Sequence, residues 1–136
     1  MANDVLEAWL RGFIADNGAV AGTVHLRDGD ILLLGAAVNI PPKVIEIVQV
    51  VPKGKGMAGL ALQRDEVVST CNLKTDETGD VRPGAKAVDA NAAVAIPVHD
   101  GAGRIRGVVG IAFAGERDIG LEEMAQLKRR AELLPV

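Results

Sequence analysis

Two predicted β-hairpins limit what this chain can fold into more than any other feature of its sequence. In the first, residues 20–27 alternate between two sides of a strand, and Asp28-Gly29 then leads into the apolar segment Ile31–Val38. The alternation has the two-residue period of a half-buried strand. An Asp-Gly pair between two such segments is typical of a tight hairpin turn. The sequence therefore predicts two antiparallel strands here.

The second predicted hairpin lies near the other end of the chain. Its strands are Ala92–His99 and residues 104–114, joined by the turn-rich segment 100–103. Four residues of the second strand are expected to share one face: Ile105, Val109, Ile111 and Phe113. Pro97 has no backbone N–H to donate, so we expect it at a sheet edge or a bulge. Two hairpins indicate an antiparallel sheet, because parallel strands need long crossover connections.

Amphipathic helices are predicted at both ends. The first spans residues 4–16, with Asp4 as its N-cap and Asn17-Gly18 as its left-handed stop. Its apolar stripe consists of Val5, Leu6, Trp9, Leu10, Phe13 and Ile14. The last helix starts near Asp118 or Gly120, and its acidic first turn and basic last turn suit the helix dipole. Its inward stripe is predicted to be Leu121, Met124, Leu127, Ala131 and Leu134.

The middle of the chain contains GKGMAG at residues 54–59, which matches the G-x-G-x-x-G motif of nucleotide-binding loops. A dinucleotide fold needs these glycines between a parallel strand and a crossover of about a dozen residues or more. Here the predicted helix covers only residues 57–64 before a strand at 67–70, and Pro52-Lys53 interrupts the apolar run before the first glycine. We therefore interpret the glycines as a sharp turn into a short helix.

The segment between the first hairpin and this motif has two interpretations. Pro41-Pro42 ends the preceding strand and suits the first turn of a helix. Residues 43–51 satisfy the helix and strand periods in part, and we favour a helix.

Composition and charge exclude several partners. The chain has 136 residues, 49% hydrophobic and 24% charged, which is typical of one globular domain. Its net charge of −3 and pI near 5.3 argue against nucleic acid, because phosphate binding needs a basic surface. No apolar run reaches the roughly 20 residues of a membrane span, and the acidic start lacks a secretory signal. The single cysteine, Cys71, fits a reducing compartment, so we expect a cytoplasmic protein.

The succession VVPKGKGMAGLAL, DEVVST, AAVAIPVHD and RIRGVVGIAFA, followed by an amphipathic helix, resembles the GAF domain family over residues 18–134. The resemblance implies an α+β fold. A GAF/PAS-like central antiparallel sheet would carry both terminal helices on one face and a ligand cavity under a lid on the other. We therefore expect one GAF-like domain over residues 1–136. Its N-terminal helix lies in 1–17, the sheet with short helices and lid in 19–114, and the C-terminal helix in 119–134.

The resemblance also implies where the ligand lies. The cavity would be walled by residues 44–48, by the glycine turn with its short helix, and by the segment after Val68. The polar segment 71–91 is expected either to close the cavity as a lid or to be a mobile surface loop, and the resemblance favours the lid. The predicted ligand-binding residues are Val44, Val48, Lys55, Gly56, Met57, Thr70, Cys71, Asn72, Asp89 and Asn91.

Other candidate chemistry in the sequence is sparse. His25 is expected on the polar side of its strand and His99 at a strand end, and with one cysteine they make no metal-ligand spacing. We interpret both as surface or structural histidines. Lys53 and Lys55 beside a helix N-terminus would attract an anionic ligand group, or would keep an exposed turn soluble. The sequence predicts no catalytic residue and no metal site, and it assigns no cofactor.

Three functions remain open. The first is a small-molecule sensor that acts in signal transduction through a partner or through a homodimer of the terminal helices. The second is a thiol-dependent redox enzyme related to free methionine-(R)-sulfoxide reductases, using Cys71. That family branch carries cysteines inside the short helix and in the lid, whereas this chain has Met57-Ala58 in the first place and no second cysteine. The third is a ligand-free dimerising scaffold. We favour the sensor, whose ligand and signalling partner the sequence does not identify.

Overall fold

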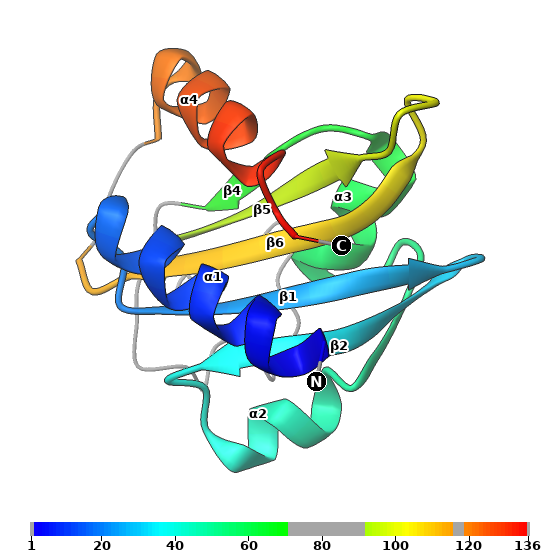
Figure 1. Cartoon of the computed structure of the whole chain (residues 1–136), viewed down its shortest axis with the longest axis horizontal. Coiled ribbons are helices and arrows are strands. Elements are labelled where there is room, and N and C mark those ends of the chain that lie inside the picture. Colours follow the sequence, from blue (N-terminus) through cyan, green and yellow to red (C-terminus); the bar gives the residue numbers. More distant parts are fainter. Residues whose placement is uncertain (1, 71–91, 116–118, 136) are drawn as a thin grey trace.

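A computed structural model describes residues 2–70, 92–115 and 119–135 of the chain (Figure 1). None of the helices in these ranges is long and apolar enough to cross a bilayer. The helices are α1 (Ala2–Asp16), α2 (Pro42–Ile47), α3 (Gly56–Arg64) and α4 (Leu121–Ala131). The strands are β1 (Ala21–Asp28), β2 (Ile31–Val38), β3 (Val50–Pro52), β4 (Val68–Thr70), β5 (Ala92–His99) and β6 (Ile105–Phe113).

The six strands form one antiparallel sheet in the order β3-β2-β1-β6-β5-β4. Both predicted hairpins are present, as the pairs β1–β2 and β5–β6. Gly29 begins the two-residue turn of the first hairpin with a positive φ of 64°, which glycine adopts without strain. Strands β1 and β6 pair with each other and join the two hairpins at the centre of the sheet. The α+β fold with a central antiparallel sheet is therefore confirmed.

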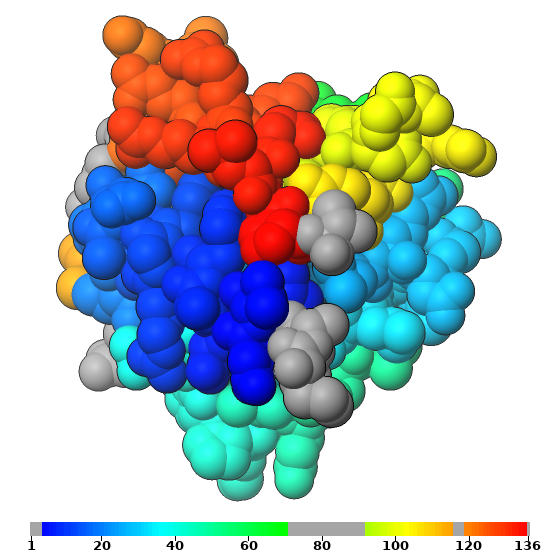
Figure 2. All heavy atoms as spheres, in the orientation of Figure 1, coloured from blue at the N-terminus to red at the C-terminus, as the bar shows by residue number. Residues whose placement is uncertain are grey.

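Helices α1 and α4 lie on the same face of the sheet, and in Figure 2 their atoms cover part of that face and leave the ends of the two hairpins visible. The main apolar core lies beneath them and includes Leu10, Phe13, Val24, Ile96 and Leu127. Nη1 of Arg130 on α4 also donates a hydrogen bond to Oδ1 of Asn17, at the end of α1, over 2.6 Å. The two terminal helices thus share one core, as the resemblance implied.

The opposite face of the sheet is also covered, by α2 and α3. A second apolar cluster there includes Leu32, Val51, Leu62, Val68 and Val108. Because both faces are covered, the central strands are buried on both sides, and seven of the eight residues of β5 are buried. The prediction that His25 lies on a polar side of β1 is therefore wrong, since it is a buried residue.

Some predicted boundaries shift. Helix α1 starts at Ala2, so Asp4 lies inside its first turn and is not the N-cap. Residues 43–51 contain both proposed structures: α2, which begins at Pro42, and the short strand β3. Leu121 is the first residue of α4 and is 86% exposed, so its predicted inward position is wrong. The N-terminal part of α4 projects past the sheet in Figure 1, and the buried stripe begins with Leu127.

A β-bulge corrects the predicted face of Ile105. His99 pairs with Ile105 and Val98 pairs with Gly107, so Arg106 is an extra residue in β6. The extra residue turns Ile105 toward α3, whereas Val109 faces the terminal helices. Pro97 precedes this bulge by one residue. Strand β4 pairs with β5 only as far as residue 95, so Pro97 lies outside the paired part on that side.

Candidate functional site

Small side chains cover the centre of the sheet on the face toward α2 and α3. Two rows of paired residues cross β1, β6 and β5 there, Ala21–Ala112–Ala93 and Thr23–Gly110–Ala95. Apart from the threonine, each of these side chains is a methyl group or a hydrogen atom. They are too short to fill the space under the helices, and a cavity of about 140 Å³ lies there.

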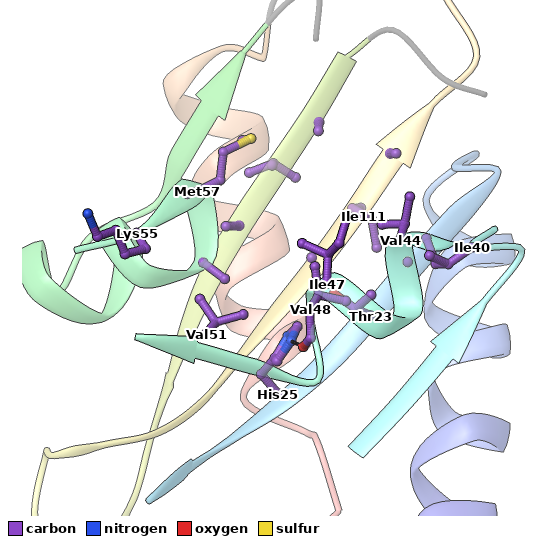
Figure 3. Close-up of a pocket in the computed structure, with 18 residues that line it drawn as sticks. Thr23, His25, Ile40, Val44, Ile47, Val48, Val51, Lys55, Met57 and Ile111 are labelled. Atoms are coloured by element: carbon purple, nitrogen blue, oxygen red, sulfur yellow. Dashed lines mark hydrogen bonds between the residues drawn. The ribbon is translucent and has the colours of Figure 1, made fainter. Parts of the chain in front are cut away.

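Apolar side chains from three elements form the walls of this cavity (Figure 3). Val44, Ile47 and Val48 of α2 and its C-terminal end lie on one side. Met57 of α3 and Val51 of β3 line the opposite wall of the cavity, on the same face of the sheet. The floor and walls together are almost wholly apolar, so the cavity suits a ligand that buries apolar surface.

The glycine turn has a structural explanation. Gly54 and Gly56 have positive φ values of 86° and 64°, which favour glycine, and a Cβ on Gly59 would lie 2.4 Å from the carbonyl oxygen of Pro52. Helix α3 has nine residues and leads into the antiparallel strand β4. This geometry is not the crossover of a dinucleotide-binding unit. The glycines close a turn that places the first residues of α3 against the cavity.

Lys55 contributes its aliphatic stem to the cavity lining. In Figure 3 its amino group points away from the other lining side chains. The side chain is exposed, and long basic side chains commonly keep the charged end in water in this way. Among the described residues, therefore, no lysine places its charge in the cavity.

His25 is the buried polar residue beside the cavity. It is 2% exposed, and its Nε2 lies 2.8 Å from the carbonyl oxygen of Val48, at the end of α2. Its Nδ1 is buried and has no hydrogen-bond partner among the described residues. Burial lowers the pKa of His25, and the bond to Val48 only partly opposes that effect. The ring is therefore neutral at neutral pH.

The structure brings half of the predicted ligand-binding residues together. Val44, Val48, Lys55, Gly56 and Met57 all line the cavity. Thr70 lies on β4 opposite Ala93 and is outside the lining. The other four, and with them the predicted lid, lie outside the described residues: Cys71, Asn72, Asp89 and Asn91.

Sequence reasoning missed His25 and the small-residue floor. Hydropathy counts alanine as apolar, so β5 looked like a uniformly apolar strand. The available signal was side-chain size, because Ala93 and Ala95 alternate with the larger Val94 and Ile96. For His25 the polar neighbours Thr23 and Arg27 suggested a solvent face that the covered sheet does not have.

A second polar cluster, which we call the His99 clasp, consists of His99, Asp65 and Glu132. Nδ1 of His99, the last residue of β5, lies 3.0 Å from Oε2 of Glu132, which directly follows α4. Its Nε2 lies 2.5 Å from Oδ1 of Asp65, the left-handed residue that ends α3. The bond to Glu132, and after it the bond to Asp65, raises the pKa of His99 against an opposing effect of burial. The clasp joins helices on opposite faces of the sheet.

Comparisons with known proteins agree with this geometry. The family model of the GAF domain matches residues 1–134. No curated protein matches the chain.

Several solved structures share the fold. Type II free methionine-R-sulfoxide reductase from Thermoplasma acidophilum is 18% identical, with a TM-score of 0.75 over 98% of this chain and 89% of that one. The GAF domain of Acinetobacter phosphoenolpyruvate-protein phosphotransferase is 20% identical, with a TM-score of 0.73 over 98% and 81%. The nlh2 GAF domain of A. aeolicus in an inactive state is 19% identical, with a TM-score of 0.68 over 98% and 79%. Identities this low show a common fold and not a common activity.

Proposed function

Because this chain belongs to the GAF domain family, we propose that it is a regulatory domain whose small-molecule ligand occupies the cavity between the sheet and helices α2 and α3. The small-residue floor is the observation that carries this proposal. Protein cores are normally packed as densely as organic crystals. On the terminal-helix face large apolar side chains fill the core, whereas the opposite face is hollow at its centre. A ligand accounts for that difference.

The response to the ligand would pass to the terminal helices. A ligand shifts a conformational equilibrium only by its differential affinity for two states. Here a ligand that favours one position of α3 would bias α4 through the His99 clasp, because Asp65 ends α3 and Glu132 follows α4. Exposed apolar residues of the terminal helices and the segment after α4, Val5, Leu121 and Leu133, would then contact a second copy or a partner protein. We propose that this takes place in the cytoplasm.

Native mass spectrometry of the protein as purified from cells tests the ligand site. The wild type is expected to carry an additional non-covalent mass that denaturation removes. Ala95→Leu fills the floor of the cavity and should abolish that mass, whereas Met57→Leu keeps the wall volume and should retain it. A mass retained by both variants would place the ligand elsewhere. An unliganded wild type that also shows no thermal stabilisation by cell metabolite extract would favour the ligand-free scaffold.

The likeness to a free methionine-R-sulfoxide reductase supports a second candidate, a thiol-dependent redox enzyme that uses Cys71. The test is consumption of free methionine-R-sulfoxide with dithiothreitol as reductant, by wild type and by Cys71→Ser. Turnover that the substitution abolishes would establish the enzyme. If neither protein turns over the substrate, and wild type and Cys71→Ser both bind a ligand, the sensor function is supported instead.

A further inference from the structure

We propose that the ligand is an uncharged, mainly apolar molecule about the size of one six-membered ring, with one N–H or O–H donor that pairs with Nδ1 of His25. This inference rests on the proposed ligand-binding function and specifies the class of ligand. It combines the size of the cavity, the absence of charge in its described lining, and a buried acceptor that the described protein leaves unpaired.

The size of the cavity sets the size of the ligand. An apolar cavity of about 150 Å³ accommodates benzene, and the cavity here has about 140 Å³. Sites for drug-sized ligands and cofactors typically have about 300–1,000 Å³. The described cavity therefore fits a single ring better than a nucleotide or a tetrapyrrole.

The lining sets the charge of the ligand. Among the described lining residues only His25 and Lys55 are ionisable, and the amino group of Lys55 points away from the cavity (Figure 3). An ion that enters an apolar site without a counter-charge loses its hydration without compensation. The other polar side chain that the described part of the lining contributes is the hydroxyl of Thr23. An uncharged ligand follows from this arrangement.

The tautomer of His25 sets the polar group of the ligand. A carbonyl oxygen only accepts, so the 2.8 Å contact with Val48 requires that Nε2 carries the proton. In the neutral ring Nδ1 is then an acceptor with a free lone pair. Buried acceptors without a partner are rare and costly in folded proteins, so each calls for an explanation. His25 lines the cavity, although Nδ1 itself has less than 1 Å² of accessible surface. A donor on the ligand would therefore pair with Nδ1 after a small turn of the ring toward the cavity.

Phenol and fluorobenzene are matched probes for this inference, because they have nearly the same shape and only phenol donates a hydrogen bond. We expect the wild type to bind phenol about fivefold more tightly than fluorobenzene in NMR titrations, as one net hydrogen bond allows. His25→Phe keeps a ring but removes the acceptor, so it should abolish the preference for phenol and change fluorobenzene affinity less than about twofold. Ala95→Leu should weaken the binding of both probes.

A measurement on the wild type keeps the test valid if His25→Phe does not fold. The ¹⁵N resonance of Nδ1 of His25 should move upfield when phenol binds and should not move with fluorobenzene. Equal affinity for both probes, with no such shift, would overturn the hydrogen bond to His25. If neither probe binds but wild type retains a cellular ligand that Ala95→Leu loses, the ligand class is wrong and the proposed function stands. If neither probe nor a cellular ligand binds, both proposals fail.

Discussion

Replacing His99 by glutamine is expected to destabilise the protein mainly at acidic pH. The folded state raises the pKa of His99 through its bonds to Glu132 and Asp65. A raised pKa means that the protonated ring stabilises the fold fully below the unfolded pKa of about 6.5. That contribution is lost as the pH rises through the higher folded pKa. The clasp should therefore contribute at pH 5.5 and contribute little at pH 8.5.

The size of this effect follows from the exposure of the groups. The His99 side chain is 19% exposed, but Glu132 is 36% and Asp65 is 54% exposed, so water and salt screen both pairs. Exposed pairs contribute about 0.2–1 kcal/mol each. We therefore expect His99→Gln to lower the free energy of unfolding by about 1 kcal/mol at pH 5.5. At pH 8.5 the loss should be smaller, because the wild-type ring is then neutral.

The other histidine of the chain acts with the opposite sign. Burial lowers the pKa of His25, so its contribution is present above the unfolded pKa and is lost as the pH falls below it. The wild-type curve thus contains two opposing effects, and only the difference between wild type and His99→Gln isolates the clasp. Urea unfolding followed by Trp9 fluorescence from pH 5.5 to 8.5 measures that difference. A difference that is constant with pH, or that grows toward pH 8.5, would refute this reasoning.

Three further substitutions test the packing, each by urea unfolding against a matched control. Gly59→Ala should cost about 1–3 kcal/mol, because its Cβ would lie 2.4 Å from the carbonyl oxygen of Pro52, whereas Gly101→Ala meets open space and should change stability by less than about 0.5 kcal/mol. Arg106→Met should lower the free energy of unfolding by about 2 kcal/mol and speed hydrogen exchange in α4, since the guanidinium donates to the carbonyl oxygens of His99, Glu132 and Leu134. Arg11 is exposed, so its control substitution Arg11→Met should have neither effect. Ala95→Leu should cost less than about 1 kcal/mol, and Ala92→Leu, on the filled face of the same strand, about 1–3 kcal/mol; equal losses would contradict the hollow face.

The parts of the fold that the sequence predicted are those with local causes. Gly29 in a positive-φ turn determines the first hairpin, and Gly18, with a φ of 69°, provides the left-handed stop predicted after α1. The clasp could not be predicted in this way, because Asp65, His99 and Glu132 are brought together only by the packing of α3, β5 and α4. The face of Ile105 depends on a bulge at Arg106, because a one-residue shift moves the side chains of a strand to the other face of the sheet.

The resemblance implied the cavity, but its floor was missed for a different reason, because the floor is made by missing side-chain volume rather than by polar groups. In β5 the larger side chains Val94, Ile96 and Val98 face the terminal helices, and Ala93 and Ala95 face the cavity. Strand β6 repeats this alternation: Val109, Ile111 and Phe113 face the terminal helices, and Gly110 and Ala112 face the cavity. The hairpin register then places Ala95 opposite Gly110 and Ala93 opposite Ala112, so the small positions of both strands coincide. A two-residue period in side-chain volume, in strands apolar throughout, would therefore predict such a cavity where hydropathy does not.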